Sequence, residues 1–213
     1  MSDKFLAHDL LWLKVDTPQR HAEWFAGLPL WARERILRRH PLVVRRELAP
    51  PGGVAVGLRG YSRAERFGCF IPAGEIARRM SPPELHGFPL REGRQSMPAL
   101  KAWEDLRHSV SVLFPWGPSG STAYELATGT DVVSATSDLD LVLYVPHPLT
   151  RREATRLLAE FEHQACHCDV QIAMPSGSAF ALREWERGDA RVLVKTPQGP
   201  VLSNKPWSVE TTV

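Results

Sequence analysis

Two aspartates, Asp138 and Asp140, open an apolar and β-branched run from Leu141 to Val145. Such a run is typical of a buried strand. Because side chains alternate along a strand, the two carboxylates share one face. They repel each other unless a cation lies between them, and oxygen ligands suit a hard ion such as Mg²⁺, which often binds one or two carboxylates together with substrate phosphates. The pair indicates metal-assisted chemistry on a phosphate.

A small-residue turn, Gly120-Ser121, precedes the aspartates and leads into a helix expected over 122–127. Backbone N–H groups and a hydroxyl at a helix start can bind phosphate oxygens. Each feature alone has a simpler interpretation, an N-cap for the turn and a solvated strand end for the aspartates. Their order and spacing, with Asp138 following Ser121 by 17 positions, resemble the nucleotidyltransferase superfamily.

A third carboxylate lies in a later strand, expected over 167–174. Alternation places Cys168, Val170 and Ile172 toward the core and Asp169 on the opposite face. An acidic side chain within an apolar strand is costly unless it is exposed, paired or metal-bound. If this strand neighbours the first, Asp169 joins Asp138 and Asp140, and three clustered carboxylates can hold two Mg²⁺ ions for phosphoryl transfer. The alternative is an exposed strand edge.

Other side chains that could bind a ligand or a metal occur in less specific sequence patterns. Lys195 lies within an expected strand over 191–195, and a charge inside a strand favours a partner, so Lys195 is expected to reach a triphosphate. The alternative is a solvated cation on an edge strand. Trp116 and Trp207 either stack on a base or pack in the core. Four residues of types that bind zinc lie close together in the sequence: His163, Cys166, His167 and Cys168. No second pair of ligands follows at the spacing of a zinc finger, so we interpret the cysteines as core residues beside a helix end.

The composition is that of a globular protein. The chain has 213 residues and a mass of 23.9 kDa, with 43% apolar and 23% charged residues. No apolar run approaches the roughly 20 residues of a membrane span. Three cysteines argue against a disulfide framework, and the first residues lack the features of a signal peptide. We expect a cytoplasmic protein without a membrane partner.

The charge is distributed unevenly. Residues 1–95 contain 16 Lys and Arg against 10 Asp and Glu, whereas residues 96–213 contain 10 against 14. A basic first half favours an anionic partner, although a merely solvated surface is as good an interpretation of charge alone.

The elements that must position these residues form two regions. Residues 1–80 predict a small basic α+β domain, with helices near 17–27 and 30–39 and strands at 8–13, 42–48, 54–59 and 66–71. Residues 81–96, rich in Pro, Gly and Ser, predict a linker. Residues 97–213 predict an α+β domain with a mixed sheet. Its expected helices are 97–109, 122–127, 150–165 and 178–187, and its strands are 110–114, 138–145, 167–174, 191–195 and 201–202.

Several blocks along nearly the whole chain resemble one family, the malonate decarboxylase holo-acyl-carrier-protein synthases, also called phosphoribosyl-dephospho-CoA transferases. The blocks are HDLLWL (8–13), RHPLVVRR (39–46), WGPSGSTAYELATG (116–129), SDLDLVLYV (137–145), CDVQIA (168–173) and VLVKTPQGPVL (192–202). The GSTAYELATG and SDLDL blocks are the most specific.

The resemblance implies a reaction. The donor is 2′-(5″-triphosphoribosyl)-3′-dephospho-CoA, the acceptor is a serine of the apo acyl carrier subunit of malonate decarboxylase, and pyrophosphate leaves. Asp138 and Asp140 would hold Mg²⁺, or Mn²⁺ in its place. Gly120 and Ser121 would bind outer phosphates. Asp169 would complete a second metal site and take the serine proton.

The carrier would dock on the arginine-rich segment over 33–46, an expectation from charge asymmetry: Arg33, Arg35, Arg38, Arg39, Arg45 and Arg46. Three other functions remain open. They are nucleotidyl transfer to a small molecule, a catalytically silent nucleotide-binding module and, ranked last because few aromatic residues interleave the arginines, nucleic-acid binding.

Overall fold

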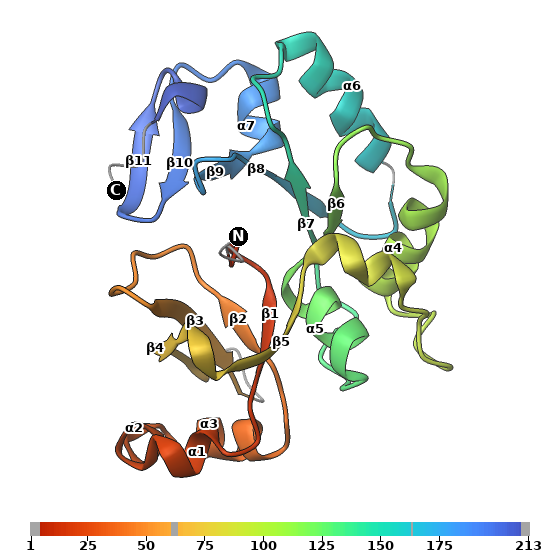
Figure 1. Ribbon diagram of the computed structural model, residues 1–213. Coiled ribbons are helices and arrows are strands. Elements are labelled where there is room, and N and C mark those ends of the chain that lie inside the picture. Colours follow the sequence, from red (N-terminus) through yellow and green to blue (C-terminus); the bar gives the residue numbers. More distant parts are fainter. Residues whose placement is uncertain (1–4, 61–63, 163, 210–213) are drawn as a thin grey trace. The chain divides into compact units, whose positions relative to one another are not determined.

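The computed structural model describes residues 5–60, 64–162 and 164–209. The chain divides into two compact units, Met1–Ser81 and Pro82–Val213. Both combine helices with β-sheet, which confirms the expected α+β class (Figure 1). Within the described ranges, no helix is both long and apolar enough to span a bilayer.

The first unit is built on a five-stranded antiparallel sheet with the order β4-β3-β2-β1-β5. Its strands are β1 (Leu10–Leu13), β2 (Leu42–Val44), β3 (Gly53–Arg59), β4 (Arg66–Pro72) and β5 (Ile76–Met80). Three helices lie together beside this sheet: α1 (Thr17–Arg20), α2 (Ala22–Gly27) and α3 (Leu30–Leu37). Buried residues of α3, Ala32 and Ile36, pack against Leu11, Val44 and Val56 of the sheet.

The second unit is built on a six-stranded mixed sheet with the order β11-β10-β9-β8-β7-β6. Its strands are β6 (Trp116–Pro118), β7 (Leu139–Tyr144), β8 (Cys168–Ala173), β9 (Ala179–Ala181), β10 (Val192–Thr196) and β11 (Gly199–Ser203). Among the strand pairs of the described residues in this sheet, β7 and β8 alone are parallel. The intervening chain therefore crosses over through a helix, α6 (Arg151–Phe161).

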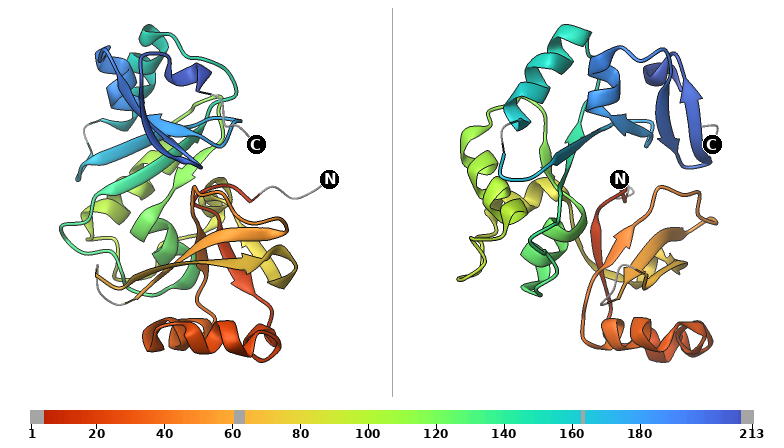
Figure 2. Two further views of the ribbon diagram at one scale, coloured as in Figure 1. Left: turned by 90° about the vertical axis from the view of Figure 1, so that its left-hand side faces the viewer. Right: turned by 180° about the vertical axis from the view of Figure 1, so that it is seen from behind.

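One face of this sheet is covered by apolar helix surfaces. Leu139, Leu141 and Leu143 of β7 pack with Trp103 of α4 (Pro98–Ser109) and with Phe161 of α6. Figure 2 shows α6 beside α7 (Leu182–Arg187), and the two helices are in contact. The helix that opens at Gly120, α5 (Gly120–Thr128), contacts β7.

Some expected elements are displaced. Residues 110–114 were expected as a strand, but the strand forms at Trp116–Pro118, because Val110, Val112 and Phe114 pack on the core without pairing in the sheet. Residues 179–181 add a strand, β9, before the helix that was expected from 178. β5 was not foreseen, because its sequence IARRM is too polar to be recognised as a strand.

The segment expected as a linker packs within the second unit. Residues Pro82–Gly87 form a 3₁₀ helix, η2, and His86 of this helix lies against the rings of Trp103 and Trp116 at 4.8 and 4.7 Å between ring centroids. Arg91 and Arg94 follow it and reach residues of α5 and of the loop after it. The first unit ends at Ser81, so residues 82–96 of this segment belong to the second unit.

Candidate active site

The parallel register of β7 and β8 aligns two of the three expected carboxylates. Asp140 is the partner of Asp169, in neighbouring strands that lie about 4.8 Å apart. Partners in register share a face, and Leu139 and Cys168 beside them point into the core. Asp138 immediately precedes β7 and is exposed. The three aspartates therefore lie at the same end of two adjacent strands.

The Gly-Ser turn meets the carboxylate of β7. β6 pairs antiparallel with β7, and the Ser119 N–H donates to the Asp140 carbonyl oxygen at 2.8 Å. Gly120 then has a φ of +59°, and a Cβ atom at this position would overlap Oδ2 of Asp140. Glycine is favoured here twice, by the left-handed backbone and by the close approach of the carboxylate.

Helix α5 begins at this contact. Gly120 is exposed, whereas Ser121 is only 9% exposed and Thr122 is fully buried. No hydrogen-bond partner of the Thr122 hydroxyl is present in the described part of the chain. The start of the helix thus presents mainly backbone N–H groups beside Asp140, an arrangement that suits an anion.

The carboxylates fit a hard divalent cation by chemistry and by strand position. In the described ranges, however, no three His, Cys, Asp or Glu side chains lie close enough together to form a ready set of metal ligands. A metal ion bound with substrate phosphates needs only one or two of these carboxylates as direct ligands. Asp140 and Asp169, opposite each other on one face, are the pair that the register favours.

The cysteines beside the aspartates are protonated thiols. Burial raises the pKa of Cys168 to about 12, and burial also raises the pKa of Cys166, with the nearby Asp138 carboxylate adding to both. The Cys168 thiol donates to the Cys166 carbonyl oxygen at 3.9 Å. His163 lies outside the described residues.

Lys195 shares the face of the carboxylates but not their position along the strands. It pairs with Ala179, which pairs with Ala173 of β8, four residues beyond Asp169. Spacings of about 3.3 Å per residue and 4.8 Å per strand put its Cα roughly 16 Å from that of Asp169. Lys195 is exposed and could contact only a distant part of a ligand anchored at the carboxylates.

The two tryptophans considered for base stacking, Trp116 and Trp207, pack inside the second unit. Trp116 is 6% exposed and makes edge contacts with Trp103 and Phe161. Trp207, in a 3₁₀ turn at Pro206–Ser208, has its ring 5.0 Å from Phe180. Core packing accounts for both rings.

Sequence reasoning missed a buried ion pair beside the site. Arg94 donates to both carboxylate oxygens of Glu125, at 2.6 and 3.0 Å. Arg94 was assigned to a linker, and the sequence around it does not indicate that its partner is Glu125, 31 residues away. One signal was available: Glu125 interrupts the apolar run of α5, and a buried carboxylate requires a partner.

In the first unit, several arginines of the segment 33–46 have structural contacts. Arg35 is 3% exposed and donates to the Gly60 carbonyl oxygen at 3.3 Å, so it cannot face a partner. Arg33 donates to the Leu28 carbonyl oxygen. Arg38 and Arg39 are exposed.

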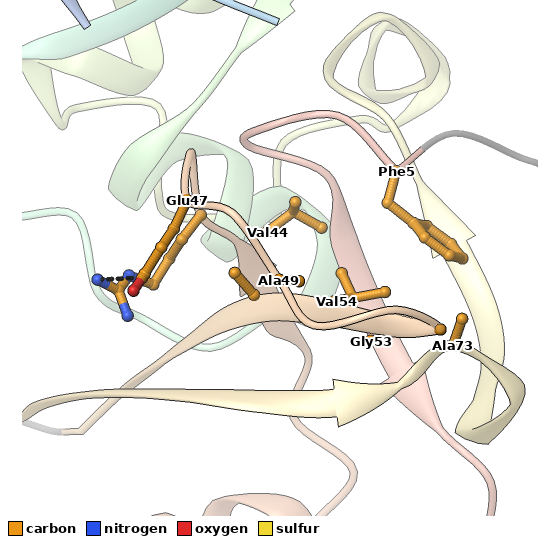
Figure 3. Close-up of a pocket in the computed structure, with 10 residues that line it drawn as sticks. Phe5, Val44, Glu47, Ala49, Gly53, Val54 and Ala73 are labelled. Carbon is orange, nitrogen blue, oxygen red and sulfur yellow. Dashed lines mark ion pairs between the residues drawn. The ribbon is translucent and has the colours of Figure 1, made fainter. Parts of the chain in front are cut away.

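The first unit also has a pocket of about 320 Å³ between the turn after β2 and strand β3 (Figure 3). Apolar side chains line it, among them Phe5, Val44 and Val54. Arg45 lies at this pocket and is paired with Glu47 at 2.8 Å, which neutralises the charge there. The exposed cations of the segment are Arg38, Arg39 and the paired Arg45.

Comparison with known proteins covers both units. Residues 89–206 match the family model "Phosphoribosyl-dephospho-CoA transferase MdcG C-terminal domain", and residues 6–82 match the corresponding N-terminal domain model. No solved structure matches the chain.

Three curated relatives carry the name phosphoribosyl-dephospho-CoA transferase. One from Pseudomonas putida is 42% identical over 95% of both chains. One from Azotobacter vinelandii is 40% identical over 94% of this chain and 93% of its own length. One from Pseudomonas fluorescens (strain Pf0-1) is 40% identical over 95% of both. The chain belongs to the phosphoribosyl-dephospho-CoA transferases, a family of enzymes.

Proposed function

We propose that this protein transfers phosphoribosyl-dephospho-CoA from 2′-(5″-triphosphoribosyl)-3′-dephospho-CoA to a serine of the apo acyl carrier subunit of malonate decarboxylase. The family membership supports a transferase of this group. The observation that carries the proposal is the alignment of Asp140 with Asp169 beside the Gly120 turn, because it combines carboxylates and an anion-binding helix start in one place.

The chemistry is a substitution at phosphorus. The serine oxygen forms a bond to the α-phosphorus of the donor, and the bond from that phosphorus to the bridging oxygen of the β-phosphate breaks. Pyrophosphate leaves with the electron pair, and the product is a phosphodiester. Catalysis of this type depends on in-line positioning and on neutralisation of charge, as in nucleotidyltransferases, the superfamily to which we assign the second unit.

Each candidate residue has a role in this scheme. The backbone N–H groups at Gly120 and Ser121 bind the outer phosphates, which become the leaving pyrophosphate. Asp138, Asp140 and Asp169 are the residues that would hold Mg²⁺, or Mn²⁺, with Asp140 and Asp169 as the pair that the register favours. When bound, the metal neutralises charge on the phosphate oxygens. Asp169 also accepts the proton of the serine hydroxyl.

Lys195 fits a second anionic group of the same donor. Dephospho-CoA contains its own diphosphate, between adenosine and pantetheine, well removed from the triphosphate. Lys195 lies on the carboxylate face but two strands away from Asp169. We assign it to that diphosphate, which is consistent with its exposure.

The carrier docks on the first unit in this proposal. Arg38 and Arg39 are the exposed cations that follow α3, and they suit an acidic protein surface. Arg35, which is buried, takes no part.

A mass measurement on the carrier tests the proposal. Wild-type protein is incubated with the apo carrier subunit, the triphosphoribosyl donor and Mg²⁺, and both carrier mass and pyrophosphate are measured. The expected result is a gain equal to one phosphoribosyl-dephospho-CoA group, with one pyrophosphate per modified carrier. A carrier whose acceptor serine is replaced by alanine is the control. No gain on the intact carrier, or an equal gain on the alanine carrier, would contradict the proposal.

A further inference from the structure

The segment that precedes Asp138 and Asp140, residues 130–137, contains no helix or strand. Helix α5 ends at Thr128 with Gly129 in the left-handed conformation, and β7 starts only at Leu139. A turn closes the last part, where the Ser137 hydroxyl accepts from the Ser134 N–H at 3.0 Å. The course of residues 130–137 must therefore be fixed from outside.

A single carboxylate holds the middle of this loop. Oε2 of Glu125 accepts the N–H groups of Val132 and Val133 at 2.9 and 2.8 Å. Glu125 is itself 5% exposed. An ionised carboxylate at such a position requires hydrogen bonds and a counter-charge.

Arg94 supplies that counter-charge and a third contact to the loop. Its guanidinium makes two hydrogen bonds to Glu125, and Nη2 also donates to the Val133 carbonyl oxygen at 2.6 Å. Burial raises the pKa of Glu125, but the bonds from Arg94 and from the two loop amides outweigh it and lower the pKa overall. Arg91 adds an ion pair to Asp131 at 2.9 Å.

The same helix therefore contacts both ends of the candidate site. Its first residue, Gly120, lies against the Asp140 carboxylate, and Glu125, on the next turn, fixes the loop that leads to Asp138. We infer that the Arg94–Glu125 pair is a positioning device, which sets Asp138 and Asp140 against the start of α5. This role rests on the proposed transfer reaction.

The chain contains a matched control for this pair. Arg107 makes a two-point ion pair with Glu104 at 2.8 and 2.7 Å and donates to the His86 carbonyl oxygen at 2.9 Å. Side chains of Arg94 and Arg107 are equally exposed, at 15%. The Arg107 pair joins α4 to η2 and holds no part of the 130–137 loop.

The experiment compares Glu125→Gln and Arg94→Met with Arg107→Met. Amide hydrogen exchange over residues 130–139 reports the order of the loop without any substrate, and thermal unfolding reports stability. For Glu125→Gln and Arg94→Met we expect faster exchange in this segment, a 10- to 100-fold lower kcat, a higher Mg²⁺ concentration for half-maximal activity and an unchanged KM for the carrier. Arg107→Met should lose stability without these changes.

The outcomes separate the two claims. Unchanged exchange over 130–139 in folded Glu125→Gln and Arg94→Met would overturn the positioning role, and so would faster exchange with an unchanged kcat. If wild-type protein does not modify the carrier, the proposed function fails by itself. Exchange in the same variants then still decides whether the pair orders the Asp138–Asp140 segment.

Discussion

At the residue scale, the contact between Gly120 and Asp140 joins the two halves of the candidate site. The turn that would bind phosphate and the strand that carries the aspartates are 20 positions apart, yet the Asp140 carboxylate lies against the Gly120 backbone. A Cβ atom at this position would force the carboxylate to move.

Replacement of Gly120 by alanine should impair transfer more than folding. The left-handed backbone costs roughly 1–2 kcal/mol with any other residue, and the new Cβ would also displace the Asp140 carboxylate. We expect a fall in kcat of about 10²-fold, measured on the carrier by mass. Gly188→Ala is the matched control, because Gly188 has a φ of +78° but open space around it. Equal kinetic effects in both variants would contradict this account.

Replacement of Lys195 should affect donor binding alone. Lys195→Met removes the charge assigned to the donor's second diphosphate, so the KM for the donor should rise about 10-fold with kcat nearly unchanged. Lys101→Met removes a cation of α4 that is paired with Asp105, and it should change neither constant. A lower kcat with an unchanged donor KM in Lys195→Met would refute the assignment.

The positions of the candidate site residues could be predicted from the sequence only in part. Alternation along two apolar strands indicates that Asp140 and Asp169 each face away from the core, but their alignment depends on a parallel register formed across α6. The proximity of Arg94 to Glu125 could not be predicted, because it depends on how the segment before α4 folds back on α5.

At the scale of elements, η2 is fixed to β6 through His86. Its Nε2 lies 3.0 Å from the Trp116 carbonyl oxygen, and its ring packs against Trp103 and Trp116, which also contact each other. Burial lowers the pKa of His86, the charge of Arg107 lowers it further, and the hydrogen bond to Trp116 opposes both.

This shift predicts a pH-dependent stability of the second unit. Because the folded-state pKa lies below the ordinary value of about 6.5, the unfolded chain binds more protons between the two values. The free energy of unfolding should therefore rise with pH through that window and level off above it. His86→Gln should be less stable throughout but have a flatter profile, measured by urea unfolding from about pH 5 to 7.5. Parallel profiles for the two proteins would exclude His86 as the source.

Element prediction was most reliable where periodicity and local signals agree. Helix α6 begins at a capping box formed by Thr150 and Glu153, and β7 is apolar apart from Asp140 and ends in Tyr144. It was least reliable at 110–118, where alternating apolar residues indicate a strand but the partner strand β7 pairs with Trp116–Pro118 instead. Strand pairing is a tertiary property that alternation cannot specify.

At the scale of the whole molecule, each unit has its own core and its own assigned task. Division into an N-terminal and a C-terminal part was visible in the change of charge near residue 95 and in the Pro- and Gly-rich segment before it. Residues Pro82–Gly87 of that segment form η2, which packs on β6.

Carrier docking on the first unit predicts a salt-dependent loss of binding. The double variant Arg38→Glu/Arg39→Glu should raise the Kd for the apo carrier about 10-fold at low ionic strength, and the difference should shrink in 0.5 M salt as charges are screened. Arg152→Glu/Arg156→Glu places the same charge change on exposed positions of α6. A Kd that is unchanged in the double variant, measured by titration calorimetry, would rule out this surface.

The most direct test of the central claim is the single-turnover rate of carrier modification in three variants, Asp138→Asn, Asp140→Asn and Asp169→Asn. Each retains the shape of the side chain while removing its charge, and Asp105→Asn on α4 provides the same change at an exposed position. We expect each of the three to slow transfer by about 10²-fold or more, and Asp105→Asn to behave as wild type. A rate near wild type in Asp140→Asn or Asp169→Asn would show that the pair aligned by the β7–β8 register is not the site of transfer.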